Sequence, residues 1–202
     1  MAEDVHYFWY GSGSLPEYTV ESIGRTARLG YTPTLWVYSP VRNAPEGCVT
    51  KDAGQVVPHE WFRTNVLDSK MLAGRKESVV YASFSDVFRA AVLFEVGGGW
   101  FDVDVIPLRR LPEVEAVVAT CPRRLTGPYA RSAPHFSTVP DGDINTSVMF
   151  AKRGTAWLGE YLNACRAYFE ARNERAAPNS FSPWLSILVR KMPVEFAAGP
   201  LL

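Results

Sequence analysis

The fold is decided by one stretch of the chain, residues 85–105, which reads SDVFRAAVLFEVGGGWFDVDV. Its first part belongs to a segment from Val79 to Val96 whose apolar composition and length predict a helix. The glycines at 97–99 end that helix, and a strand is expected directly afterwards, over Trp100 to Val105. This stretch therefore predicts a helix that leads straight into a strand.

The segments before and after it continue this alternation. A strand at Val5 to Trp9, a helix at Leu15 to Leu29 and a strand at Thr34 to Tyr38 form a βαβ beginning. Further strands are expected at Val114 to Thr120 and Asn145 to Ala151, and further helices at Thr155 to Arg172 and Ser182 to Lys191. This order predicts an α/β fold, one domain over residues 1–202 with a mostly parallel sheet between helices. Ligands of such sheets bind beyond the carboxyl ends of the strands.

Composition excludes several classes of protein. The 202 residues are 47% hydrophobic, and 21 Lys and Arg balance 21 Asp and Glu, so no strongly basic nucleic-acid surface is expected. No apolar run reaches membrane-spanning length, the first residues resemble no targeting peptide, and three scattered cysteines suggest no disulfide framework. We expect a cytoplasmic protein with no membrane span. The glycine patterns of Rossmann dehydrogenases and of P-loop kinases are both missing.

Two aspartates, Asp102 and Asp104, stand at the end of the strand expected after the glycines. Alternation along a strand would point both carboxylates the same way. Two such carboxylates repel each other unless a cation lies between them, and Mg²⁺ and Mn²⁺ prefer oxygen ligands of this kind. The pair is therefore a candidate metal site, and the alternative is a solvated turn.

A second polar pair, Asp86 and Arg89, lies one helical turn apart on the preceding helix. Helical spacing places both on one face with Ala90 and Leu93, while the opposite face, which includes Phe84 and Phe88, packs on the sheet. We expect the pair to share a polar cleft with the two aspartates. The alternative is an ordinary surface ion pair.

These motifs resemble the signature of the DXD-containing sugar transferases, which include Golgi mannosyltransferases, capsule-synthesis transferases and glucosylating bacterial toxins. The resemblance covers roughly Val5 to Trp157, and the spacing from Asp86 to Asp104 is its most specific part. Its outer pieces are FWYGS at 8–12, CVTKDAGQVVP at 48–58 and DINTSVMFAKRG at 143–154. The resemblance implies a GT-A fold and a metal-dependent, retaining transfer of sugar from a nucleotide-sugar donor, a UDP-sugar, to a hydroxyl acceptor.

The resemblance also implies a role for each matching residue. Trp9, followed by Gly11, would stack on the nucleotide base, and Trp100 would lie beside the nucleoside. Asp86 and Arg89 would bind sugar hydroxyls, and Asp102 would reach the ribose or sugar. Asp104 would bind Mn²⁺ or Mg²⁺ directly with Asp102 beside it, and Asn145 would lie near the reacting face of the donor sugar.

The sequence departs from the family at three places. Gly99 replaces an aliphatic residue, Trp100 replaces the usual tyrosine, and the C-terminal region that closes the donor site is short. We expect a lid over about residues 178–202 in which Ser182 and Trp184 contact the leaving phosphate. Asn179, Ser180 or Ser182 would supply the missing third metal ligand.

Several alternatives remain open at the level of sequence. Asp141 or Asp143 would act as the base if the enzyme inverted the sugar. A cluster of Arg123, Arg124 and Arg131 is either solvated or directed at an anionic acceptor. The acceptor itself is a glycan or, in the alternative of a viral-type DNA glycosyltransferase, a modified nucleobase. A non-catalytic sugar-nucleotide-binding domain is a further alternative. The three histidines, His6, His59 and His135, are expected to be structural or acceptor-side, and Trp157, Tyr161, Cys165 and Tyr168 to form a core stripe.

Overall fold

The computed structural model describes residues 4–68, 76–111, 116–121 and 143–170. In chain order these residues form β1 (Asp4–Trp9), α1 (Glu17–Arg28), β2 (Thr32–Val37), β3 (Val49–Asp52), η1 (Ala53–Gln55), α2 (His59–Phe62), η2 (Arg63–Leu67), α3 (Glu77–Glu95), β4 (Gly98–Phe101), β5 (Ala116–Cys121), β6 (Asp143–Ala151) and α4 (Ala156–Glu170). The helix expected at Ser182 to Lys191 lies outside these ranges. The other expected helices and strands are all present.

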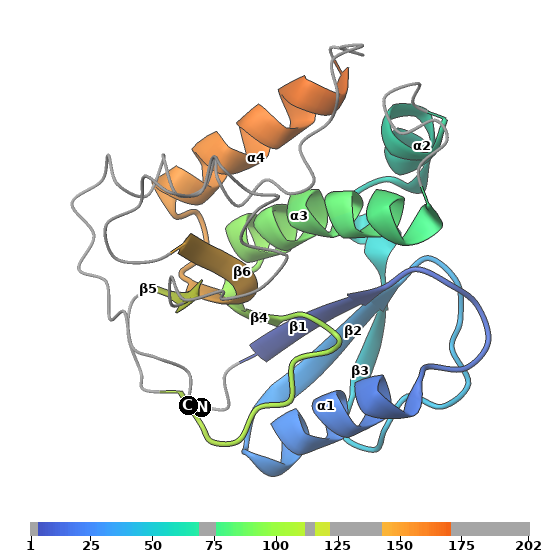
Figure 1. Ribbon diagram of the computed structural model, residues 1–202, viewed down its shortest axis with the longest axis vertical. Coiled ribbons are helices and arrows are strands. Elements are labelled where there is room, and N and C mark those ends of the chain that lie inside the picture. The colour runs from blue at the N-terminus through green and yellow to red at the C-terminus, as the bar shows by residue number, and fades with distance from the viewer. Residues whose placement is uncertain (1–3, 69–75, 112–115, 122–142, 171–202) are drawn as a thin grey trace, which may run out of the picture.

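The strands form one six-stranded sheet in the order β3-β2-β1-β4-β6-β5. β1 pairs in parallel with β2 and with β4, β2 pairs in parallel with β3, and β6 runs antiparallel to both β4 and β5. The helix α1 covers one face of this sheet, whereas α3 covers the other and is itself covered by α4 (Figure 1). The expected α/β fold with a mostly parallel sheet is confirmed.

The order of the strands reverses at β1. From β1 the chain moves outward to β2 and β3, and it then returns to β4 on the other side of β1. Such a reversal separates the loops that follow the two central strands, and ligands of open α/β sheets bind in the crevice between them. In this chain those loops follow Trp9 and Phe101.

The structure corrects two sequence expectations. The strand expected over Trp100 to Val105 ends at Phe101, and residues 102–105 form a turn. The segment from Val49 to Leu67, for which no elements were expected, contains β3, η1, α2 and η2. All four residues of β3 are exposed, so this edge strand lacks the apolar alternation that identifies strands in a sequence.

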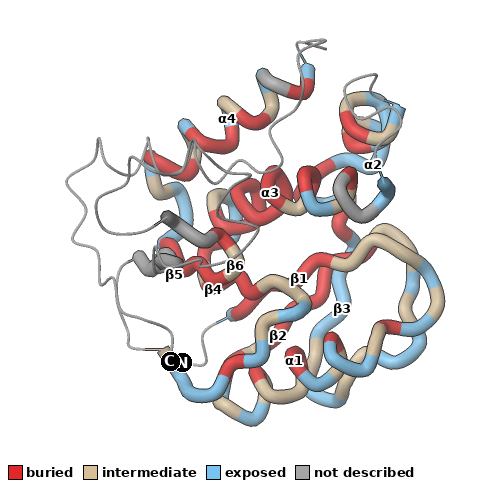
Figure 2. The backbone as a smooth tube through the Cα atoms, viewed as in Figure 1, coloured by how far each residue is buried: buried red, intermediate tan, exposed pale blue. Residues whose placement is uncertain are grey.

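The core lies in two layers, one on each face of the sheet (Figure 2). The cluster under α3 and α4 includes Phe84, Phe88 and Trp157, and the cluster under α1 includes Tyr7 and Ile23. The expected core stripe is confirmed for Trp157, Tyr161 and Cys165, while the side chain of Tyr168 lies outside the described ones.

Gly99 lies so close to a core side chain that no Cβ atom would fit at this position. A Cβ atom built on Gly99 would lie 2.5 Å from Cε1 of Phe150, on the neighbouring strand β6. The absence of an aliphatic side chain at this position therefore leaves room for a phenylalanine on β6.

Two further features lie outside the site. No helix in the described ranges is both long enough and apolar enough to cross a membrane. Cys165 is buried and Cys48 is half-buried, and burial raises the pKa of Cys48 to about 11, so this thiol stays protonated near neutral pH.

His6 is a structural residue in the centre of the sheet. Its side chain is buried, and its imidazole Nε2 lies 2.9 Å from the carbonyl oxygen of Gly97, to which it donates. Nδ1 accepts a hydrogen bond from Nε1 of Trp36 at 3.3 Å. Burial lowers the pKa of His6 below its ordinary value of 6.5, and the bond to Gly97 opposes this only in part. The folded protein therefore holds His6 neutral.

This predicts a pH-dependent stability. Below about pH 6.5 the unfolded chain binds a proton at His6 and the folded chain does not, so the free energy of unfolding falls as the pH is lowered from 7.5 to 5. Urea unfolding should show a shallower decrease in His6→Gln than in the wild type. His59→Gln, at an exposed histidine, should keep the wild-type decrease. Equal slopes in the wild type and His6→Gln would contradict the assignment.

Candidate active site

The candidate site lies at the carboxyl edge of the sheet, where β1 and β4 end side by side. Register places Val5 opposite Gly99 and His6 opposite Trp100, so both strands end at this same edge. Trp9 closes β1 and is followed by Gly11, while Asp102 and Asp104 follow β4. The topology thus brings together two motifs that are about ninety residues apart in the sequence.

The turn that carries the two aspartates has a defined geometry. The Asp102 N–H donates to the carbonyl of Ser147 on β6 at 2.8 Å, which extends the pairing of β4 by one bond. The Val105 N–H then donates to the carbonyl of Asp102 at 3.0 Å and closes the turn. The expected strand alternation therefore does not orient the two carboxylates; this turn does.

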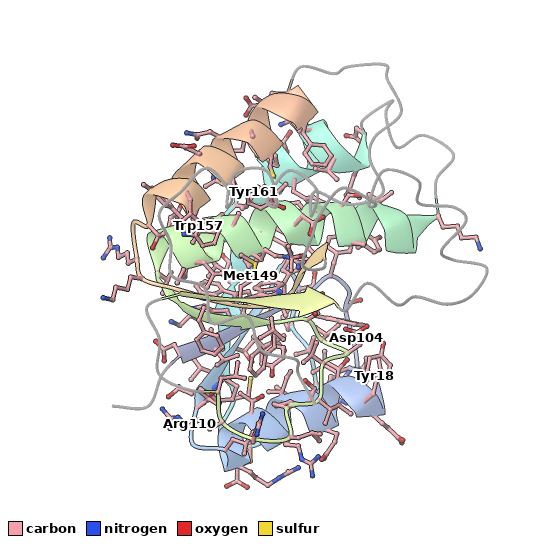
Figure 3. All side chains as sticks on the ribbon, turned by 60° about the vertical axis from the view of Figure 1, so that its left-hand side comes forward. Tyr18, Asp104, Arg110, Met149, Trp157 and Tyr161 are labelled. Carbon is pink, nitrogen blue, oxygen red and sulfur yellow. The ribbon has the colours of Figure 1, made fainter. Side chains whose placement is uncertain are left out.

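The two valines of the turn anchor it to the core. Val103 and Val105 are half-buried and pack against the cluster under α1. The hydroxyl of Ser22 on α1 donates to the carbonyl of Val105. Asp104, between the valines, is exposed, and Figure 3 shows it on the same side of the molecule as Tyr18 in the first turn of α1. The valines of this turn thus pack on the core, while Asp104 faces away from it.

Asp102 is held by two donors. Trp100 Nε1 donates to Asp102 Oδ1 at 2.7 Å, and Arg89 Nη2 lies 3.3 Å from the same oxygen. The Arg89 guanidinium also lies 5.4 Å from the centre of the Trp100 ring. The Asp102 side chain is still 28% exposed. Its carboxylate is therefore oriented by the protein while part of it remains open to a ligand.

Arg89 is the centre of a buried polar network. Its Nη2 lies 3.2 Å from Asp86 Oδ1 and 3.2 Å from the hydroxyl of Ser85, and its Nη1 donates to the carbonyl of Thr146 on β6. The side chains of Arg89 and Asp86 are only 5% and 6% exposed. The reading of this pair as a surface ion pair is wrong, because α4 covers the face of α3 that the helical spacing assigned to a cleft.

The charges of this network are mutually stabilising. Burial alone would lower the pKa of Arg89, but the carboxylates of Asp102 and Asp86 raise it above its ordinary value. Burial raises the pKa of the Tyr161 hydroxyl on α4 well above 10, and the negative charge of Asp86 raises it further. Arg89 therefore stays charged and Tyr161 stays neutral.

Sequence reasoning missed two members of this network, Ser85 and Thr146. Ser85 lies one turn before Arg89 on α3, a spacing that a search for polar neighbours would have found. The contribution of Thr146 is its backbone carbonyl, which no side-chain pattern reveals. Tyr161 was placed in the core stripe, and it is indeed buried.

Trp9 lies on the α1 side of the sheet edge. Its side chain is half-buried and packs against the cluster under α1. Gly11 has a φ of +153°, and a Cβ atom there would lie 3.1 Å from Trp9 Nε1, so the missing side chain makes room for the indole edge. Trp9 is therefore partly core and partly available at the edge where the two aspartates lie.

The remaining expected site residues are described only in part. Asn145 lies near the start of β6 and directly precedes Thr146, so its backbone is next to the Arg89 network, but its side chain is outside the described ones. The structure does not describe Ser182, Trp184, the lid at 178–202, Asp141, or Arg123, Arg124 and Arg131.

The donor set fits a divalent cation held with few protein ligands. Within the described ranges no group of three or more metal-ligating side chains is found. Mg²⁺ and Mn²⁺ commonly bind through one or two carboxylates and complete their coordination with water and substrate phosphates. The exposed Asp104 and the partly open Asp102 match that arrangement.

The network predicts an unequal cost for removing two arginines. Arg89→Ala leaves the buried Asp86 without its cation, so we expect a loss of about 3–5 kcal/mol in the free energy of unfolding. Arg63→Ala, which removes an exposed ion pair with Glu60, should change the free energy of unfolding far less than Arg89→Ala does. Chemical denaturation of both variants checks this, and similar small losses would show that Arg89 is not held as described.

Comparisons with known proteins agree with this geometry. Residues 44–120, which include Asp86, Arg89, Asp102 and Asp104, match the family described as glycosyltransferase sugar-binding region containing DXD motif. Comparison with curated protein sequences finds no match. Among solved structures, the PaToxG glycosyltransferase shares the fold, with a TM-score of 0.55, 14% identity, and coverage of 94% of this chain and 73% of that chain. The expected resemblance is thereby confirmed over residues 44–120, which are similar to the DXD-containing sugar-binding region of glycosyltransferases.

Proposed function

We propose that this glycosyltransferase transfers a sugar from a UDP-sugar donor to a hydroxyl acceptor with the help of a divalent metal ion. The observation that carries the proposal is the turn after β4. It presents one free carboxylate, Asp104, next to one oriented carboxylate, Asp102, at the point where the strand order reverses. A diphosphate leaving group needs charge stabilisation at such a position.

Asp104 would hold Mn²⁺ or Mg²⁺ directly, with Asp102 beside it. The bound cation would stabilise the negative charge on the leaving diphosphate. Asp102 has one oxygen engaged by Trp100 and Arg89, so its second oxygen is the one assigned to the ribose or the sugar.

Arg89 and Asp86 receive different roles. The N–H groups of Arg89 are directed at Ser85, Asp86, Asp102 and Thr146, so we assign to it the positioning of Asp102 and of the start of β6. The family resemblance implies that Asp86 binds a sugar hydroxyl, but its side chain is only 6% exposed and pairs with Arg89, so we assign to it the positioning of Arg89. Asn145 is proposed to lie beside the donor sugar, and Ser182 and Trp184 to close the site over the diphosphate.

Trp9 is proposed to stack on the nucleotide base, with Gly11 allowing close approach. Trp100 is only 1% exposed, so in place of the expected position beside the nucleoside we assign to it the orientation of Asp102. Support comes from the position of Trp9 at the carboxyl end of β1 and from its partly exposed ring. For the transferred sugar we propose retention of configuration, on the family resemblance. NMR of the first-formed product, before mutarotation, would decide it.

The metal proposal predicts loss of activity without loss of structure. Asp104→Asn should abolish transfer from a UDP-sugar and its dependence on added Mn²⁺, because it removes the negative charge of the proposed direct ligand. The melting temperature should not change, since the carboxylate is exposed. Asp4→Asn, at an exposed aspartate on the opposite edge of the sheet, should retain activity. Transfer by Asp104→Asn in the presence of EDTA would overturn the metal proposal.

The donor proposal predicts a binding defect in Trp9→Ala. Loss of base stacking should weaken the binding free energy of UDP by about 1–3 kcal/mol. The dissociation constant measured by calorimetry should therefore rise roughly 5- to 150-fold. Trp61→Ala, at a half-buried tryptophan that bonds to Glu170 on α4, should leave UDP affinity unchanged. A large fall in melting temperature with unchanged affinity would make Trp9 a core residue only.

A further inference from the structure

An exposed arginine, Arg42, lies over the turn that follows β1. Its Nη2 atom would be 3.9 Å from a Cβ atom built on Gly13. Gly13 has a φ of +96°, a conformation that favours glycine, and it belongs to the same short turn as Gly11. The guanidinium is therefore placed at the carboxyl edge of the sheet, next to the proposed donor site.

The backbone that carries Arg42 is fixed on both sides. Its own N–H donates to the carbonyl of Gly13 at 2.8 Å, and Val41 forms a parallel bridge with Gly13. The side chain of Asn43 accepts from the N–H of Leu15 at 2.6 Å and donates to the carbonyl of Leu15 at 3.0 Å. Residues 41–43 are thus tied to residues 13–15, and the arginine projects from an anchored segment.

The Arg42 side chain has no evident structural task. Within the described ranges no carboxylate lies within ion-pair distance of it, and the residue is exposed. Arg25, Arg28, Arg63 and Arg89 pair with carboxylates, whereas Arg109, Arg153 and Arg166 form no such pair within the described residues. What distinguishes Arg42 is therefore its place beside the turn after β1. A guanidinium on a fixed backbone, with its N–H groups free, is suited to bind a ligand.

Trp9 lies against the same turn. The indole Nε1 of Trp9 would be 3.1 Å from a Cβ atom on Gly11, and the α-carbons of Gly11 and Gly13 are at most about 7 Å apart along the chain. A base stacked on Trp9 would therefore present its edge near the turn over which Arg42 lies.

We propose that Arg42 reads the base of the donor nucleotide and selects a keto base over an amino base. The inference rests on the proposed function, specifically on Trp9 stacking on that base. A guanidinium offers only donors, which match the carbonyl oxygen at position 4 of uracil or thymine and at position 6 of guanine, the edge that we assign to Arg42. At the same positions cytosine and adenine carry an amino group, which is itself a donor and would face the guanidinium unfavourably.

A contact with the diphosphate is the competing role for this cation. The two roles differ in their selectivity, because UDP and CDP carry the same diphosphate and differ only at the edge of the base. A base-reading arginine affects UDP alone, whereas a phosphate-binding arginine affects both nucleotides equally.

Calorimetric titration of the full chain with UDP and with CDP, each with Mn²⁺, tests the proposal. The wild type should bind UDP about 5- to 150-fold more tightly than CDP, the range expected for one good base contact. Arg42→Ala should bind UDP as weakly as the wild type binds CDP, and its affinity for CDP should not change. GDP and ADP form the corresponding purine pair, and the preference for GDP should be lost in the same variant.

Arg153→Ala is the matched control, since Arg153 is exposed and lies beside Gly97 at the opposite edge of the sheet. It should keep the wild-type preference, and unchanged melting temperatures would show that both variants fold. Equal losses for UDP and CDP in Arg42→Ala, no loss at all, or a wild type that does not discriminate would each overturn the inference. The donor proposal stands independently if the wild type binds UDP and the Trp9→Ala variant binds UDP more weakly. If no nucleotide binds the wild type, both the donor proposal and the Arg42 inference are overturned.

Discussion

The buried guanidinium of Arg89 holds the site and the core together. A charge in a protein interior is tolerated only when paired and hydrogen-bonded, and here the partners come from three places: α3 itself, the turn after β4, and β6. Because one rigid, planar group contacts all three, none of them can shift without exposing a polar group to an apolar surrounding. The position of Asp102 is thereby set by the same interaction that joins the elements around it.

The topology of the sheet explains why these partners meet. β4 lies beside β1, and both end at the same edge. β6 runs antiparallel to β4, so β6 begins where β4 ends, and residues at its start are delivered to that edge. The turn after β4 divides its residues between two tasks. Its valines pack on the α1 side of the sheet, and its aspartates remain outside that core.

Local pattern was enough to predict the parts of the fold that are locally determined. The helix before the glycines and the first two strands agree closely with the sequence, because apolar periodicity and glycine or proline boundaries identify them. The end of β4 was not predictable in this way. The turn that replaces the last expected strand residues is held by hydrogen bonds to Ser147 and Ser22, which are remote in sequence.

The site shows the same division between local and remote causes. The residue types and spacing of Asp86, Arg89, Asp102 and Asp104 indicated a shared cluster, and the structure brings the first three into contact. Burial of Asp86 and Arg89 could not be inferred, since a helix with a polar face is ordinarily expected to expose it. That face is covered here because α4 packs on α3 from the far end of the sequence.

The close approach of Gly99 to Phe150 has an evolutionary consequence. The two positions share one volume across β4 and β6, so a side chain gained on one strand has to be given up on the other. A relative with an aliphatic residue in place of Gly99 is accordingly expected to carry a smaller residue opposite it. The departure from the family pattern at position 99 is thus matched to Phe150 by packing, and the two positions are expected to covary among relatives that keep this pair of strands.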